Sequence, residues 1–149
     1  MRNPSPPRIS VRNIQRKISV NIAELERFAA NALQHCLDLR NGKRSDLRQS
    51  REVFVWLISD RRMALLHRKF LGLLGPTDVL TFQHGEIFIS VETARRHARA
   101  FGNSFARELK LYIVHGLLHL HGFEDETSAE ARRMKTAQEK ILRICSRER

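Results

Sequence analysis

The stretch VHGLLHLHGFED, residues 114–125, organises this chain because it places metal-ligand side chains in a segment with the apolar pattern of a buried helix. His115 and His119 are four residues apart on an apolar run that begins near Phe105. Side chains at that spacing lie on the same face of a helix, so both imidazoles can bind one ion. A catalytic zinc site has three protein ligands and one open position, and Asp125 is the predicted third ligand.

Gly122 explains how the chain returns Asp125 to the histidines. Because glycine has no Cβ, it adopts the left-handed conformation that ends a helix and reverses the chain. His121 is two positions from His119 and points elsewhere, so we interpret it as a partly exposed or supporting histidine and not as a ligand. The alternative is an ordinary pair of hydrogen-bonded core histidines. The metal site is favoured because the pair, the glycine and the carboxylate fall in one short window.

Three segments carry a resemblance to a known family. Residues 115–123 closely resemble the signature H-G-x-L-H-L-x-G-[YF]-x-[HD] of the YbeY family, the rRNA maturation factors and metal-dependent endoribonucleases. GPTDVLTF at 75–82 and GEIFIS at 85–90 resemble the family's P-T-D-V-L-[ST]-F and G-[DE]-I-x-I-S elements, in the same order and ahead of the histidines. With VRN at 11–13, the similarity spans most of the chain.

This resemblance implies a single-strand-specific, zinc-dependent endoribonuclease that acts in rRNA processing, especially at the 3′ end of small-subunit rRNA, and in ribosome biogenesis. His115, His119 and Asp125 would be the catalytic residues and would hold one Zn²⁺ per chain. Zinc lowers the pKa of a bound water and stabilises charge on a phosphoryl oxygen. The implied partners are single-stranded RNA and the ribosome or its small subunit, in the cytoplasm.

Two positions depart from the family pattern. Asp125 stands where histidine is most frequent, and it keeps an anionic oxygen donor that suits zinc. Leu71 stands where many members carry an arginine that is associated with activity. The neighbouring Arg68 and Lys69 are therefore the predicted basic contacts to the substrate.

Thr77 and Asp78 complete the predicted substrate contacts, because the resemblance places their segment near the metal cleft. From the residues alone, Asp78 is better suited to fixing the turn through hydrogen bonds to the backbone. Glu124 and Glu126 are interpreted as solvated loop acids.

The chain carries a large excess of positive charge. Its 149 residues include 27 Lys and Arg against 16 Asp and Glu, for a net charge of +11, which indicates a polyanionic partner. We expect that partner to be RNA and not DNA. No apolar run approaches the length of a membrane span, so we expect no membrane partner. Cys36 and Cys145 are far apart in the sequence, and we interpret both as reduced core thiols of a cytosolic protein.

Periodicity and capping signals predict one α/β (α+β) domain over residues 1–149, with residues 1–8 as a flexible lead-in. The expected architecture is a four-stranded mixed sheet packed by about five helices, including a zincin-like metal helix. Predicted strands lie at 9–18, 53–58, 79–82 and 86–90; strand 53–58 is expected to be central and covered on both faces. Predicted helices begin at Asn21, Ser59 or Asp60, Ser90 or Thr93, Ser104, and the capping box at 127–130.

Finer expectations concern packing faces and connections. The second helix carries Met63, Leu66 and Phe70, and the last helix should pack through Ala131, Met134, Ile141 and Ile144. Residues 41–45 are a polar break and residues 72–76 a turn. An edge strand from the hairpin at 79–90 is expected beside the metal site.

Two other functions fit parts of this pattern. A metallopeptidase shares the H-x-x-x-H-x-x-G-x-x-D spacing, but such enzymes place a glutamate general base directly after the first histidine, where this chain has Gly116. The other alternative is a non-catalytic ribosome assembly factor with a structural metal. That alternative predicts RNA binding that survives loss of the metal ligands.

Overall fold

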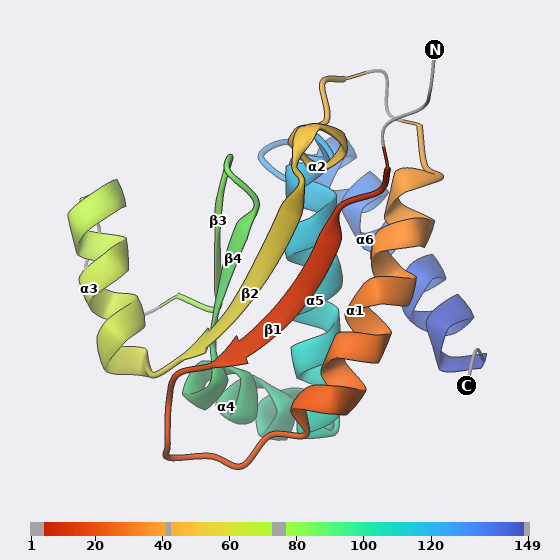
Figure 1. The fold of residues 1–149 in the computed structure, drawn as a ribbon. Helices are drawn as coiled ribbons and strands as arrows, with labels where there is room; N and C mark the ends of the chain where they lie inside the picture. Colours follow the sequence, from red (N-terminus) through yellow and green to blue (C-terminus); the bar gives the residue numbers. More distant parts are fainter. Residues whose placement is uncertain (1–4, 41–42, 73–76, 148–149) are drawn as a thin grey trace.

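A computed structural model describes residues 5–40, 43–72 and 77–147. The described residues form one domain with a four-stranded mixed sheet, as predicted (Figure 1). In chain order the elements are β1 (Arg8–Asn13), α1 (Ile22–Leu37), α2 (Asp46–Gln49), β2 (Glu52–Ile58), α3 (Asp60–Leu71), β3 (Val79–Phe82), β4 (Glu86–Ser90), α4 (Val91–Phe101), α5 (Phe105–Leu120) and α6 (Ser128–Arg147). The sequence did not predict α2, because four residues are too short to show helical periodicity.

The sheet has the order β1-β2-β4-β3, with β1, β2 and β4 parallel and β3 antiparallel to β4. The prediction of a central strand at 53–58 is confirmed, since β2 lies between β1 and β4. One face of β2 is fully buried through Val53, Val55 and Leu57. The other face, which carries Phe54 and Trp56, is only half-buried, so the predicted cover on both faces is incomplete.

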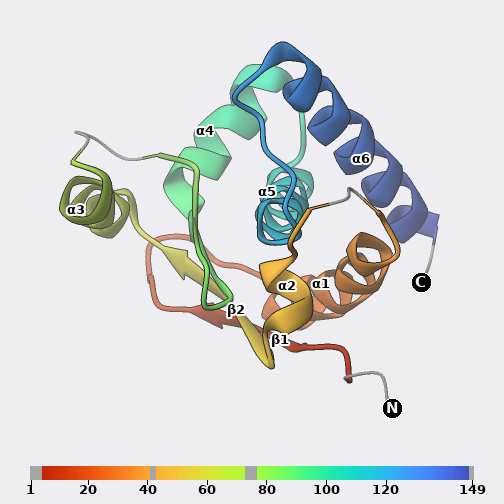
Figure 2. The same ribbon diagram turned by 90° about the horizontal axis from the view of Figure 1, so that it is seen from above.

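Helix α5 is the centre of the helical layer. Seen from above, it is surrounded by α1, α4, α6 and the sheet, whereas α3 lies on the other side of the sheet (Figure 2). Nine of the sixteen residues of α5 are buried, and Gly116 lets its backbone approach β4. In α3, Met63 is buried, Leu66 is half-buried, and Phe70 is 55% exposed with its ring in edge contact with that of Phe82 on β3.

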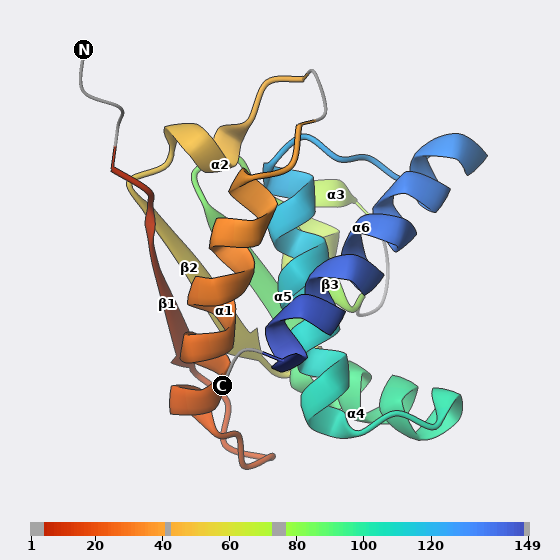
Figure 3. The same ribbon diagram turned by 90° about the vertical axis from the view of Figure 1, so that its right-hand side faces the viewer.

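The last helix packs on a face shifted from the predicted one. Met134 and Ile141 are buried as expected, but Ala131 is exposed and Ile144 is half-buried. The physical reason is that the N-terminal part of α6 projects beyond α5 while its later turns pack between α5 and α1 (Figure 3). The buried face is completed by Ala137, Leu142 and Cys145.

Several boundaries also differ from the sequence expectations. Arg8, the last residue of the predicted lead-in at 1–8, already belongs to β1, and residues 1–4 lie outside the described residues. Strand β1 ends at Asn13 and not at residue 18. Parts of the predicted break at 41–45 and turn at 72–76, namely 41–42 and 73–76, lie outside the described residues. Cys36 and Cys145 are both buried and form no disulfide, and burial raises the pKa of Cys36. In the described segments, no helix is both long and apolar enough to cross a membrane.

Candidate metal centre

Local capping chemistry sets the limits of the metal helix as predicted. The Ser104 side chain accepts a hydrogen bond from the backbone N–H of Arg107 at the start of α5. At the other end, Gly122 has a φ of 96°, the positive value that glycine tolerates. The backbone N–H of Phe123 then donates to the carbonyl of Leu118 at 2.9 Å. This turn brings the loop that carries Asp125 back over the helix.

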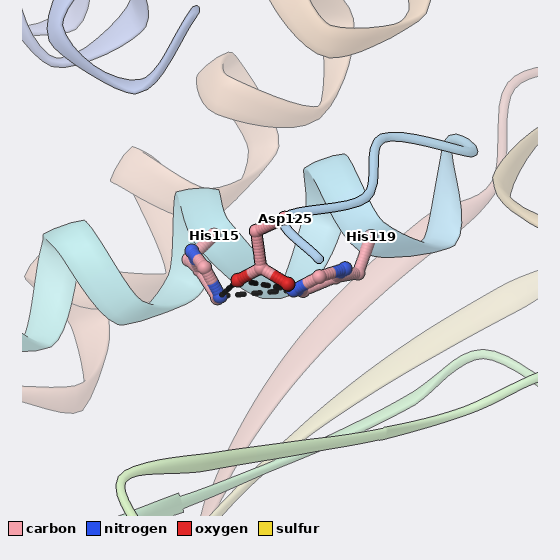
Figure 4. A group of neighbouring side chains, drawn as sticks. All are labelled: His115, His119 and Asp125. Carbon is pink, nitrogen blue, oxygen red and sulfur yellow. Dashed lines mark hydrogen bonds and ion pairs between the residues drawn. The ribbon is translucent and has the colours of Figure 1, made fainter. Parts of the chain in front are cut away.

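The three predicted ligands converge (Figure 4). The Nε2 atoms of His115 and His119 are 2.9 Å apart, and each lies 3.6 Å from Oδ2 of Asp125. The histidine side chains are 27% and 26% exposed, and that of Asp125 is 43% exposed. The two histidines are therefore half-buried against the protein, and the cluster is open to solvent at Asp125.

Hydrogen bonds on the far side of each ring orient both imidazoles. Nδ1 of His119 lies 3.0 Å from the carbonyl oxygen of Phe123, and Nδ1 of His115 contacts Oε1 of Gln138. Both partners are acceptors, so this network assigns the ring hydrogen of each histidine to Nδ1. Each Nε2 then presents a lone pair to the other and to the carboxylate. Such a group of facing acceptors is stabilised by a shared cation.

The residues fit a divalent cation. A tetrahedral zinc ion about 2.0–2.1 Å from its donors requires donor–donor separations of about 3.3 Å, and the observed 2.9 and 3.6 Å lie on either side of that value. Among the described residues, these three form a group whose ligand atoms all lie within 4.8 Å of one another. Burial and the neighbouring His115 ring lower the pKa of His119, although Asp125 opposes this effect. A lowered pKa keeps the His119 lone pair available to metal at neutral pH.

Gln138 was not identified from the sequence. It lies on α6, between Met134 and Ile141 on the same helical face. A polar residue inside an apolar helical stripe is the signal that marks such a position. Its identity as the partner of His115, however, depends on how α6 packs against α5.

An open groove lies beside the metal cluster. His119 and Phe123 line one side, and Thr81 and Gln83 from the edge of the sheet line the other. The expectation of an edge strand next to the metal site is therefore confirmed. A strand edge facing a metal cluster leaves room for an extended substrate.

His121 is buried and not partly exposed, so that part of the interpretation was wrong. The residue is 2% exposed; its Nδ1 lies 2.7 Å from Oγ of Ser45, and its Nε2 lies 2.7 Å from the carbonyl oxygen of Leu39. Burial lowers the pKa of His121. The residue ties the end of α5 to the N-terminal cap of α2, an element that the sequence did not reveal.

The predicted substrate contacts lie apart from the metal groove. Arg68 and Lys69 are exposed on α3, and Leu71 is 56% exposed on the same helix. Oδ1 of Asp78 accepts a hydrogen bond from the backbone N–H of Val79 at 2.8 Å, as the turn-fixing interpretation predicts. Thr77 lies beside it, with Oγ1 3.4 Å from Oδ1 of Asp78. None of the four predicted contacts is among the described residues that line the groove.

Gly116 leaves no space for the glutamate of a metallopeptidase. A Cβ built at this position would lie 2.7 Å from Cγ2 and 3.0 Å from Cδ1 of Ile87 on β4. The side chain of any larger residue would point into the sheet and not toward the metal cluster. The peptidase alternative therefore lacks its general base for a steric reason as well as a chemical one.

Comparisons with known proteins agree with this geometry. A family model described as Endoribonuclease YbeY matches residues 10–146. The endoribonuclease YbeY of Moorella thermoacetica is 39% identical over 110 residues, which cover 61% of this chain and 70% of that protein. Its counterpart from an Anaeromyxobacter species is 37% identical over 106 residues, covering 64% of this chain and 55% of that protein. A solution structure from Thermotoga maritima has a TM-score of 0.62 and 28% identity, and the match covers 92% of this chain and 88% of that one. This chain belongs to the endoribonuclease YbeY family.

Proposed function

We propose that this chain hydrolyses single-stranded RNA at a zinc site formed by His115, His119 and Asp125, and that it matures the 3′ end of small-subunit rRNA. By its family, the chain is an endoribonuclease, a hydrolase that acts on RNA in rRNA processing. The observation that carries the finer proposal is the convergence of two imidazole nitrogens and one carboxylate oxygen beside an open groove.

Each residue of the site has a separate task in this proposal. The three ligands would hold the cation, which supplies an acidified water and stabilises charge on a phosphoryl oxygen when it is bound. The Phe123 carbonyl and Gln138 hold the two rings through their Nδ1 atoms, so that both Nε2 atoms face the cation. The groove beside the cluster holds the RNA backbone in an extended form.

A cleavage assay tests the metal and its ligands together. Purified protein is incubated with labelled single-stranded RNA before and after chelation, and again with zinc restored. Cleavage is expected to stop on chelation and to return with zinc, and His119→Ala is expected to abolish it. His35→Ala, a change to a histidine on α1, is the matched control. Undiminished cleavage after chelation and in His119→Ala would refute the proposal.

A binding assay separates the enzyme from the assembly-factor alternative. The enzyme predicts that His119→Ala still binds rRNA but leaves the small-subunit rRNA precursor unprocessed in cells. An assembly factor with a structural metal predicts that the wild-type protein binds the same RNA without cleaving it under any metal condition. Association with the small ribosomal subunit is expected in both cases, so turnover is the discriminating measurement.

Arg68 and Lys69 are proposed as basic contacts to the substrate, with Thr77 and Asp78 shaping the turn beside them. The support is that both cations are exposed on α3, where they are accessible to a phosphate backbone. Reversing both charges is expected to weaken RNA binding and to flatten its salt dependence. An unchanged salt slope would contradict this assignment.

The proposed location is the cytoplasm. Cys36 and Cys145 are both buried and unbridged, which suits a compartment that keeps thiols reduced. Fractionation of cells that express the tagged protein, followed by detection of the protein with ribosomal subunits, tests both the location and the proposed ribosomal partner.

A further inference from the structure

The groove at the metal cluster does not end there. Its lining residues Arg44, Asp46 and Gln83 also line a second groove, which extends to Arg51. The second groove in turn shares Gln49, Ser50 and Arg51 with a third one, which reaches Arg8 and Arg48. Because neighbouring grooves share lining residues, the three grooves adjoin one another over α2, and together we call them the α2 path.

Charge changes along the α2 path. Near the metal cluster, Lys43 lies 3.5 Å from Glu124, and Arg44 lies 3.7 Å from Asp46, so positive and negative side chains offset one another. At the far end, the groove is lined by Arg8, Arg48 and Arg51, with no acidic residue among the described lining residues. The metal cluster at the near end suits a cation, and the arginine-lined far end suits an anion.

The far end is assembled from three segments of the chain. Arg8 is the first residue of β1, Arg48 lies on α2, and Arg51 precedes β2. The backbone N–H of Arg8 donates to the carbonyl of Arg51 at 3.0 Å, which holds these two residues side by side. Arg48 donates to the carbonyl of Leu37, and all three side chains are exposed. We call these three residues the arginine cluster.

The distance between the arginine cluster and the metal cluster is held by buried contacts. His121 follows the metal helix directly and bonds Oγ of Ser45, and that same oxygen accepts the backbone N–H of Arg48 at 3.1 Å. Leu47 of α2 is fully buried in the core. The α2 path therefore has a fixed geometry, as a binding site for an extended polymer requires.

We infer that the substrate RNA follows the α2 path, with a backbone phosphate at the arginine cluster while the phosphodiester to be cleaved lies at the metal cluster. The inference rests on the proposed function and assigns the direction in which the strand leaves the site. Guanidinium groups form paired hydrogen bonds with phosphate oxygens, and the polar side chains of Gln49 and Gln83 offer further contacts between the two ends. An acidic protein segment on the same surface is the alternative that the experiment must exclude.

The test compares two double variants with equal loss of charge. Arg8→Gln with Arg51→Gln removes two guanidiniums from the arginine cluster, and Arg95→Gln with Arg99→Gln removes two exposed ones from α4. Arg48 is left unchanged because it bonds the Leu37 carbonyl. Binding of single-stranded RNA is measured over a salt series in the non-cleaving His119→Ala background. The first pair is expected to reduce the slope of log K against log salt by about 0.7, the value for one lost phosphate contact on a single strand, and the second pair to change it far less.

A length series gives the second readout. For the wild-type protein, KM is expected to fall as the RNA is extended far enough to reach the arginine cluster, and Arg8→Gln with Arg51→Gln is expected to lose that length dependence. Arg8→Lys with Arg51→Lys should restore the salt slope, since it keeps both charges. Equal slopes in the two double variants, or an unaltered length dependence, would overturn the inference. A loss of affinity for an acidic peptide in the first pair, in place of a loss of affinity for RNA, would overturn it as well. Failure of the proposed function is distinguishable, because it appears as absence of cleavage by the wild-type protein.

Discussion

Helices α5 and α3 begin in the same way and have opposite environments. Each is capped by a serine, Ser104 or Ser59, whose side chain accepts a backbone N–H of the first turn. Nine residues of α5 are buried, whereas in α3 only Met63 is. The two predicted histidine ligands lie on the helix that cannot move without disturbing the core. Arg68 and Lys69 lie on a helix whose side chains are free to adapt.

The difference follows from what each helix packs against. Helix α5 contacts α1, α4, α6 and the sheet, so the orientation of its ligands is set from several directions (Figure 2). Helix α3 contacts β4 and α4, and is anchored mainly through Asp60 at its first turn. A reaction at a metal ion requires ligands in a fixed geometry, whereas contact with the backbone of a flexible RNA strand does not. Four changes test this contrast.

Gly116→Ala should have the largest effect. The new Cβ lies 2.7 Å from Cγ2 of Ile87, so α5 must move away from β4. We expect a loss of about 1–3 kcal/mol in the free energy of unfolding, together with reduced RNA cleavage. A decrease in the free energy of unfolding would itself identify the clash, because a change from glycine to alanine within a helix otherwise stabilises the protein by about 1 kcal/mol. Urea unfolding of this variant, of Ile87→Ala and of the double variant measures the coupling; strictly additive energies would contradict the clash.

Gln138→Ala should weaken metal binding without unfolding the protein. Loss of the acceptor for Nδ1 of His115 frees the ring to rotate and to change tautomer. Such supporting changes typically lower metal affinity by about 10-fold to 100-fold. Competition with a zinc-sensitive chelator measures the affinity. Gln138→Glu keeps an acceptor for Nδ1 of His115 and should retain most of the metal affinity. Lys140→Ala on the same helix is the control. Wild-type affinity in Gln138→Ala would show that α5 alone orients the ring.

Asp60→Asn should loosen α3 in a pH-dependent way. Burial raises the pKa of Asp60, but hydrogen bonds from Arg96, Ser90 and Thr93 outweigh it and leave the pKa below its ordinary value. A carboxylate with a lowered folded pKa stabilises the fold above its unfolded pKa of about 3.9, and this contribution is lost as pH falls through the lower folded value. We expect Asp60→Asn to cost about 1 kcal/mol at pH 6.

The control for Asp60 is Asp38→Asn, an exposed aspartate at the end of α1. Urea unfolding at pH 6 and at successive values below 4 gives the comparison. The difference in the free energy of unfolding between wild type and Asp60→Asn should decrease at the lowest pH values. A gap that stays constant with pH would show that the ionised carboxylate does not anchor α3.

Leu71→Arg should have the smallest effect on stability. The side chain is 56% exposed, so the free energy of unfolding should change by less than about 0.5 kcal/mol. The variant carries the arginine that the family resemblance implies at this position. RNA binding should strengthen, and its salt slope should steepen by about 0.7. Leu65→Arg is the matched control, since Leu65 is also 56% exposed on α3. Equal gains in RNA affinity for both variants would mean that the added charge strengthens binding wherever it lies on α3.

Elements defined by local chemistry were the ones predicted most accurately. The strands β3 and β4 match the predicted bounds residue for residue, because alternation on either side of a glycine turn is a short-range pattern. The capping box of α6 is present, with Thr127 and Glu130 each accepting the other's backbone N–H. By contrast, the exposure of Phe70 and the pairing of His121 with Ser45 depend on segments far away in the sequence.

The sequence by itself determined which residues can bind the metal, since a four-residue helical spacing and a glycine with positive φ bring His115, His119 and Asp125 together within one short segment. Tertiary structure alone decided how that segment is used. It set the face of α5 that meets Ile87, brought Gln138 to His115, and opened the α2 path beside the cluster. The physical reason is range: helix geometry and capping involve neighbouring residues, whereas packing and surface shape depend on contacts between distant ones.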